Sequence, residues 1–190
     1  MQLLKETKLR VAGVIEESIV DGPGLRFVLF LQGCRLHCEG CQNPQTWDFE
    51  GGTLVSGDEV LARIKADPLV HGVTFSGGEP FEQAEALLPL ALALKEQGYH
   101  LMAYTGYTLE QLLQKPEYRA FLESLDLLVD GPFIEAQKSL DLRFRGSRNQ
   151  RILNIPASRE NGWQAVLDKL NEAMEVNVSQ AGIKICYLAD

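Results

Sequence analysis

The chain has 190 residues, of which 45% are hydrophobic and 23% charged, a length and composition that suit one domain with an ordinary globular core. Its formal net charge of −8 argues against non-specific binding to nucleic acid and against attachment to anionic membranes. No apolar run approaches the roughly 20 residues of a membrane helix, and Met1–Lys8 contains no apolar signal core, so the sequence predicts a cytoplasmic protein.

The N-terminal part of the chain predicts two strands joined by a glycine-rich loop. Residues 10–15 and 25–31 are short apolar runs, and Asp21-Gly22-Pro23-Gly24 marks a loop between them. Further along, Ser56 and Glu59 form a capping-box pattern in front of apolar residues at helical spacing. This pattern predicts the first helix.

The rest of the chain alternates strands with helices. Strands are predicted over residues 72–76, 100–104, 126–130 and 151–154. Helices are predicted over residues 82–97, from residue 108, and over 117–124 and 163–174, with a small hairpin over 175–187. Pro89 is expected to kink or split the first of these helices. The alternation indicates an α/β fold with a mainly parallel sheet. About six strands are too few for a closed eight-stranded barrel, so we expect a partial (β/α) barrel.

Four segments rich in polar or glycine residues directly follow predicted strands. They are the cysteine loop at 33–43, Gly77-Gly78-Glu79, Thr105-Gly106 and Asp130-Gly131. Because the carboxyl ends of parallel strands meet at one edge of a sheet, these segments are expected to converge. The sequence therefore predicts a functional site at the C-terminal ends of the strands.

The cysteine loop carries the strongest chemical signal. Cys34, Cys38 and Cys41 follow a Cys-x3-Cys-x2-Cys spacing and account for three of the chain's four cysteines. Three thiolates bind one metal centre and leave a coordination position open, which favours a 4Fe-4S cluster with one non-cysteine site. The alternative is zinc, with His37 or a distant residue as the fourth ligand, although zinc sites usually pair two cysteine units. Cys186 is predicted to be a spare thiol.

Gly77-Gly78-Glu79-Pro80 allows two interpretations. The simpler one is an ordinary glycine turn between a strand and a helix. The functional one is a ligand cradle, because glycines let the backbone approach a ligand closely. In that case, backbone carbonyls and the Glu79 carboxylate can accept hydrogen bonds from an ammonium group.

These two motifs together resemble the radical S-adenosylmethionine superfamily. Residues 21–26 are similar to the opening segment of the activating enzymes of glycyl-radical enzymes. Residues 38–49, 129–133 and 144–151 resemble the activating proteins of anaerobic ribonucleoside-triphosphate reductases. The resemblance implies a single radical S-adenosylmethionine domain over residues 1–190.

The resemblance also implies a mechanism and a set of site residues. One 4Fe-4S cluster on Cys34, Cys38 and Cys41 would bind S-adenosylmethionine through its unique iron and reduce it. Methionine and a 5′-deoxyadenosyl radical would result, and the radical would take a hydrogen atom from a glycine of a large partner. The implied S-adenosylmethionine contacts are Asn43, Gly77, Gly78, Glu79, Pro80, Thr105, Gly106, Asp130, Ser147 and Asn149. No catalytic residue beyond the cluster ligands is needed, since the cofactors carry the chemistry.

The implied partners are a glycyl-radical enzyme, best matched by the anaerobic reductase, and a flavodoxin-like electron donor. A formate-lyase-like target, a small-molecule substrate and a zinc-stabilised binding module without catalysis are the alternatives. Related activators often carry an acidic residue, at a monovalent cation site, where this chain has Tyr104. Two further features stay open. Trp47 either anchors a partner, covers the cluster or packs the loop. Four arginines between residues 143 and 151 either form a solvated turn or contact a carboxylate of the cosubstrate or partner.

Overall fold

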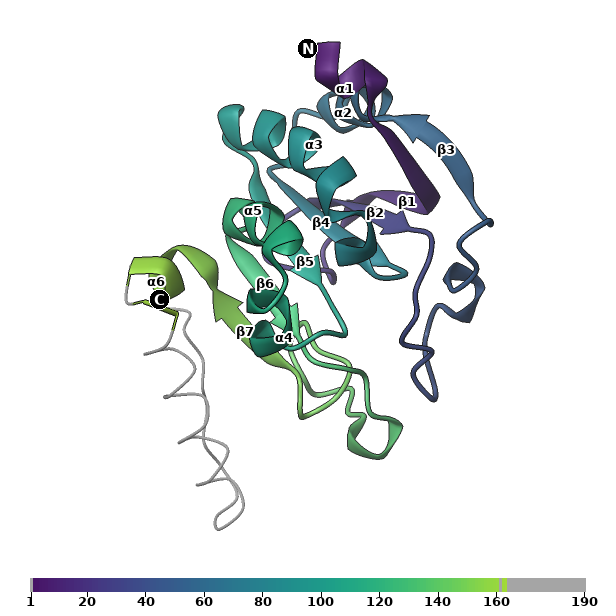
Figure 1. Ribbon diagram of the computed structural model, residues 1–190, viewed down its shortest axis with the longest axis vertical. Coiled ribbons are helices and arrows are strands. Elements are labelled where there is room, and N and C mark those ends of the chain that lie inside the picture. Colours follow the sequence, from purple (N-terminus) through teal and green to yellow (C-terminus); the bar gives the residue numbers. More distant parts are fainter. Residues whose placement is uncertain (1, 161, 164–190) are drawn as a thin grey trace.

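The computed structural model describes residues 2–160 and 162–163 as a sheet with helices packed against it (Figure 1). Beyond Trp163, the helix predicted over residues 163–174, the hairpin predicted over 175–187 and Cys186 lie outside the described residues. Within the described part of the chain, no helix is long and apolar enough to cross a membrane.

Seven strands of the described chain form one sheet, in the order β3-β1-β2-β4-β5-β6-β7. The strands are β1 Lys8–Ser18, β2 Arg26–Leu31, β3 Thr53–Ser56, β4 Gly72–Gly77, β5 His100–Tyr104, β6 Leu127–Asp130 and β7 Arg151–Asn154. Strands β2, β4, β5 and β6 pair in parallel, whereas the β1–β2, β1–β3 and β6–β7 pairs are antiparallel. The α/β class is therefore confirmed, and the prediction of a mainly parallel sheet is wrong. The curvature of a partial barrel stays a prediction.

The antiparallel edges have local causes. A parallel return needs a crossover, usually a helix, and the segment between β6 and β7 contains only the 3-10 turn η3 Glu135–Gln137. Strand β3 is the strand that the sequence prediction missed. Its four residues are too short to show an alternating pattern, and they pair with Lys8–Val11 of β1.

The helices are α1 Gln2–Glu6, α2 Gly57–Lys65, α3 Ala84–Glu96, α4 Leu109–Leu113, α5 Pro116–Ser124 and α6 Ile155–Glu160, with 3-10 turns η1 Pro44–Thr46 and η2 Pro80–Gln83. The capping box of Ser56 and Glu59 is confirmed at the start of α2. The expected split at Pro89 is wrong, because α3 runs through this residue. Burial of Leu87, Leu90 and neighbouring apolar side chains offsets the hydrogen bond that proline removes.

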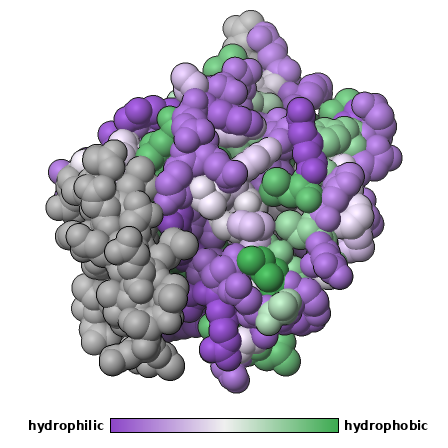
Figure 2. All heavy atoms as spheres, turned by 60° about the horizontal axis from the view of Figure 1, so that its bottom comes forward, coloured by the Kyte–Doolittle hydropathy of each residue, from purple (hydrophilic) through white to green (hydrophobic). Residues whose placement is uncertain are grey.

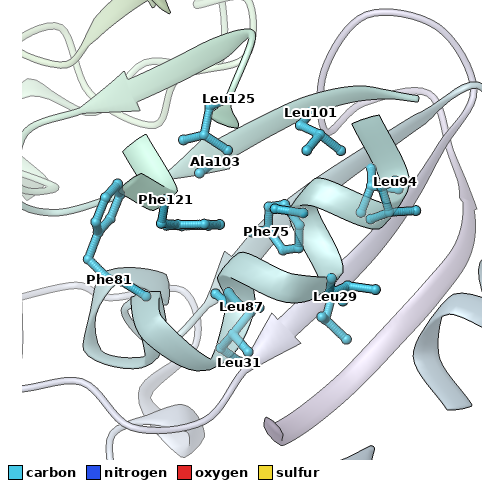
Figure 3. Packing of buried hydrophobic residues seen from close by; sticks show 14 of the residues in the cluster. Leu29, Leu31, Phe75, Phe81, Leu87, Leu94, Leu101, Ala103, Phe121 and Leu125 are labelled. Carbon is cyan, nitrogen blue, oxygen red and sulfur yellow. The ribbon is translucent and has the colours of Figure 1, made fainter. Parts of the chain in front are cut away.

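The main core lies between the sheet and α2, α3 and α5. Phe75 of β4, Leu87 of α3 and Phe121 of α5 are almost completely buried and lie close together in it (Figure 3). Since side chains alternate along a strand, the residues on either side of Phe75 face the opposite side of the sheet. Phe30 and Ser76 pair on neighbouring strands on that second side, and both line the cavity described below. The sheet therefore separates the helix-covered core from the candidate site.

Candidate metal centre and ligand cavity

The cysteine loop starts and ends at one place because its two ends pair through the backbone. The Gly33 N–H donates to the Thr46 carbonyl at 2.8 Å, and the Cys34 N–H donates to the Trp47 carbonyl at 3.1 Å. The side-chain amide of Gln32 adds a bond to the Asp48 carbonyl at 2.7 Å. The loop therefore returns to the end of β2 before it continues toward β3.

Inside the loop, backbone turns bring all three thiols to one cavity. His37 and Gly40 have positive φ angles of 46° and 70°, and the Cys41 N–H donates to the Cys38 carbonyl at 3.1 Å. Cys34 is buried and the other two cysteines are half-buried. Burial raises the pKa of the Cys34 thiol, so metal binding by this residue must release a proton.

The donor set fits an iron–sulfur cluster better than a single ion. Among the described residues, no three His, Cys, Asp or Glu side chains are grouped to hold one metal ion. A zinc ion bound by several thiolates would bring their sulfurs within about 4 Å of one another, since each Zn–S bond is about 2.3 Å. In a 4Fe-4S cluster each cysteine binds a different iron, so the thiols stand further apart. The Asn43 N–H points to Cys41 Sγ at 3.4 Å, a contact of the kind that tunes such clusters.

The cavity has a volume of about 520 Å³ and lies at the C-terminal ends of the parallel strands. Figure 2 shows the molecule with the bottom of Figure 1 brought forward, where apolar side chains lie among hydrophilic ones. The sequence-predicted residues that line the cavity are Cys34, Cys38, Cys41, Asn43, Gly77, Gly78, Glu79, Thr105 and Gly106. The structure thus brings together the thiols and the segments that follow β4 and β5.

Gly77 and Gly78 press the end of β4 against the cysteine loop. The Gly78 N–H donates to the Leu31 carbonyl at 2.8 Å, and the Glu79 N–H donates to the Gly33 carbonyl at 2.9 Å. A Cβ atom on Gly78 would lie 2.4 Å from the Gly33 oxygen, and one on Gly77 would lie 2.5 Å from the Leu31 nitrogen. Both glycines are therefore needed for backbone packing, whatever they also do toward a ligand.

Glu79 ties the segment after β4 to the segment after β5. Its buried carboxylate accepts hydrogen bonds from Thr105 Oγ1 at 2.9 Å, from the Gly106 N–H at 2.8 Å and from the Phe81 N–H at 3.1 Å. Burial raises the pKa of Glu79 to about 7, although these bonds favour the charged form. A carboxylate accepts up to about four hydrogen bonds, which leaves capacity for one donor from a ligand.

Four other predicted site residues lie outside the cavity lining. Pro80 is buried in the turn η2, and Asp130 faces α4, where it accepts from the Leu109 N–H at 2.7 Å and forms an ion pair with Arg151. Ser147 Oγ accepts from the Ile134 N–H at 3.2 Å. Asn149 donates to the Pro132 carbonyl at 2.7 Å. Asp130, Ser147 and Asn149 therefore hold the wall of the site in this structure.

Several cavity residues were not predicted as site residues. Asp21, Tyr104, Phe144, Arg145 and Gln150 all line the cavity. Asp21 belongs to the segment similar to glycyl-radical activators, and burial raises the pKa of Tyr104, with Asp21 nearby adding to the rise. The alternation along β2, β4 and β5 could have indicated the inward-facing strand residues. The residues of the 131–150 segment carry no such periodic signal.

Trp47 also lines the cavity, beside the cysteines. Its ring stacks on His37 with 4.6 Å between ring centroids and an interplanar angle of 26°. Its indole nitrogen is buried and has no hydrogen-bond partner within the described chain. The stack packs the loop on itself, so the packing role is observed, and the roles as a partner anchor or a lid stay predictions.

Comparison with known proteins first gives the class of this domain. Residues 20–153 match the family described as a 4Fe-4S single cluster domain. This span begins before the cysteine loop and ends within β7, so it contains the whole cavity described above. The family agrees with the donor set and confirms the prediction of one 4Fe-4S cluster over a zinc site.

Named relatives then give the particular group. The chain is 35% identical over 143 residues to the anaerobic ribonucleoside-triphosphate reductase-activating protein of Haemophilus influenzae, and 37% identical over 143 residues to that of Vibrio cholerae serotype O1. Each alignment covers 71% of this chain and 91% of the relative. The chain therefore belongs to the radical S-adenosylmethionine activating proteins, in the same family as these two relatives.

Two more distant similarities complete the comparison. The chain is 42% identical over 104 residues to the pyruvate formate-lyase-activating enzyme of Clostridium pasteurianum, which covers 52% of this chain and 44% of that enzyme. The solved structure of QueE from Escherichia coli aligns with 53% of this chain and 54% of that chain, at 22% identity and a TM-score of 0.43, which is too low for a comparison of folds.

Proposed function

We propose that this protein activates an anaerobic ribonucleoside-triphosphate reductase by generating a glycyl radical on it, with a 4Fe-4S cluster and S-adenosylmethionine. The observation that carries the proposal is the shared cavity, in which three thiols of one loop meet the segment Gly77–Glu79. The two relatives that cover 71% of the chain support the choice of the reductase as the target. The proposed domain spans residues 1–190.

The chain's own residues would hold and orient the cofactors. Cys34, Cys38 and Cys41 would bind the cluster, which supplies one electron for reductive cleavage of the carbon–sulfur bond of S-adenosylmethionine when it is bound and reduced. The cavity volume of about 520 Å³ falls in the usual range of roughly 300–1,000 Å³ for small-molecule sites. Glu79 and the backbone carbonyls beside it would accept hydrogen bonds from the ammonium group.

The apolar part of the lining would protect the reactive species. Phe30, Leu36, Phe133, Leu142 and Phe144 surround the cavity with hydrocarbon. An apolar enclosure excludes water and prevents side reactions of reactive intermediates. We propose that Asp130, Ser147, Asn149 and Pro80 act on the cofactor site through the segments that they hold. A flavodoxin-like protein is the proposed electron donor, and this part rests on the family resemblance.

The test is anaerobic reconstitution of the protein with iron and sulfide, followed by addition of S-adenosylmethionine and a reductant. We expect 5′-deoxyadenosine and methionine, and a glycyl radical signal in electron paramagnetic resonance when the anaerobic reductase is added. A protein that carries a full cluster and binds S-adenosylmethionine but forms no 5′-deoxyadenosine would refute the proposal.

A second candidate target is a formate-lyase-like enzyme, favoured by the 42% identity to the Clostridium pasteurianum activating enzyme over 104 residues. The same assay separates the two targets. A radical on the formate lyase and none on the reductase, at equal 5′-deoxyadenosine formation, would reverse the order of the candidates.

A further inference from the structure

Arg145 stands apart from the other arginines of the segment 143–151. Arg143 and Arg148 are exposed and lie outside the cavity lining, and Arg151 pairs with Glu110 and Asp130. Arg145 lines the cavity and is the one cationic side chain among the described residues that do so. The basic segment therefore delivers a single positive charge to the site.

The guanidinium of Arg145 has donors that the described chain leaves unused. Its Nη1 donates to the Gln150 carbonyl at 2.8 Å, whereas its Nε is buried and has no hydrogen-bond partner in that part of the chain. No carboxylate of the described residues lies within ion-pair distance of it. A buried donor without a partner is costly and uncommon in folded proteins. This arrangement indicates that the side chain is completed by an acceptor from outside the chain.

Gln150 holds the backbone around Arg145 in place. Its Oε1 accepts from the Gly146 N–H at 2.9 Å and from the Ser147 N–H at 3.2 Å, and its Nε2 donates to the Gly131 carbonyl at 3.2 Å. These bonds fasten the arginine-bearing loop to the residue that follows β6. Arg145 is therefore pre-positioned at the cavity, which lowers the entropy lost when it binds a ligand.

The two carboxylates of the lining do not compete for this arginine. Asp21 accepts from Ser18 Oγ at 2.5 Å, and the Glu79 oxygens accept the three bonds described above. The unmet chemistry of the cavity is thus a set of N–H donors on a permanent cation, whose planar fork matches a carboxylate. A ligand with an amino-acid end carries both the carboxylate for Arg145 and the ammonium for Glu79.

We propose that Arg145 binds the carboxylate of the methionyl end of S-adenosylmethionine, an inference that rests on the proposed function. A carboxylate has two oxygens, so one can accept from Arg145 while the other stays available to the metal. The assignment separates Arg145 from Arg148, which carries the same charge three residues away. It makes Arg145 a residue that selects cosubstrates with a free carboxylate.

The test compares the affinities of the cluster-loaded protein for S-adenosylmethionine and for its decarboxylated form, measured by anaerobic equilibrium dialysis without reductant. We expect Arg145→Gln to weaken binding of S-adenosylmethionine by about ten- to hundredfold, because a hydrogen bond to a charged group is lost. The same substitution should change binding of the decarboxylated compound by less than about threefold. Arg148→Gln, which removes the same charge from the same loop, should leave both affinities unchanged.

Arg145→Lys provides a second variant, and it should fall between wild type and Arg145→Gln because lysine keeps the charge but lacks the fork. Equal losses for both compounds in Arg145→Gln would mean a structural role and would overturn the proposal. Unchanged affinity for S-adenosylmethionine would overturn it as well, and would favour contact with an acidic partner. Wild-type protein that binds neither compound would instead refute the proposed function.

Discussion

Gly78→Ala tests whether the end of β4 and the cysteine loop form one packed unit. The added Cβ would lie 2.4 Å from the Gly33 oxygen and 3.0 Å from the Thr46 oxygen, so the two segments must separate by at least about 0.6 Å to reach a 3.0 Å contact. Both oxygens belong to backbone at the ends of the cysteine loop, which cannot rotate away as a side chain can. The backbone conformation of Gly78 itself permits alanine, because its φ is not in the left-handed region.

The expected loss follows from overpacking of a rigid contact. Such substitutions destabilise by about 1–3 kcal/mol, and the 2.8 Å and 2.9 Å backbone bonds beside Gly78 are the first to stretch. For a domain of this size, each kcal/mol lowers the melting temperature by about 2–4 °C. A shift of this kind at the loop should also lower the iron bound after reconstitution, because ligands must be held within about 0.5 Å.

The measurements are thermal unfolding of the metal-free protein and iron content after anaerobic reconstitution. Gly13→Ala is the matched control, since a Cβ on Gly13 would meet nothing within 4 Å and its φ also permits alanine. We expect it to change stability by less than about 0.5 kcal/mol. Equal melting temperatures and equal iron contents for the two variants would refute the packing argument.

Three further predictions concern the thiols and two carboxylates. Cys34→Ala, Cys38→Ala and Cys41→Ala should each abolish cluster absorbance and 5′-deoxyadenosine formation, whereas Cys186→Ala should not, and normal product from Cys38→Ala would contradict the ligand assignment. The pKa of Glu79 is raised to about 7 by burial, so the folded state binds more protons than the unfolded state above the ordinary pKa of 4.5. Stability should therefore fall by up to about 3 kcal/mol as pH rises to 7, and denaturant titrations should show this slope in wild type and lose it in Glu79→Gln. Arg151 holds the pKa of Glu110 at about 2, so Glu110→Gln should destabilise by less than about 1 kcal/mol at neutral pH. That difference should vanish as pH falls through 2, and one that persists there would have another cause.

Elements with strong local signals could be predicted from the sequence. The strands His100–Tyr104 and Arg151–Asn154 and the capped helix starts at Ser56 and Thr108 lie where the patterns place them. Their signals are local, because apolar runs, glycines and caps act within a few residues. Strand direction depends instead on how the chain crosses the sheet. The antiparallel β7 and the short β3 were therefore not predicted.

The candidate site divides in the same way. Segments that directly follow parallel strands were predicted, since strand ends must meet at one edge of the sheet. Arg145 and Gln150 lie in the long segment between β6 and β7, whose course depends on bonds to distant residues such as Gly131. Asp130 follows the strand rule in sequence, but its side chain faces α4 and Arg151. Side-chain direction at a strand end depends on packing that the sequence alone does not show.

The backbone closure of the cysteine loop separates folding from metal loading. Closing the roughly twelve residues between Gly33 and Thr46 costs about 2 kcal/mol of chain entropy, and the bonds at 2.8 Å and 3.1 Å meet that cost without a metal. Small zinc domains, in contrast, fold only when the metal binds. A protein stripped of its cluster by oxygen should therefore keep its fold, and a repair system could rebuild the cluster in place without refolding the chain.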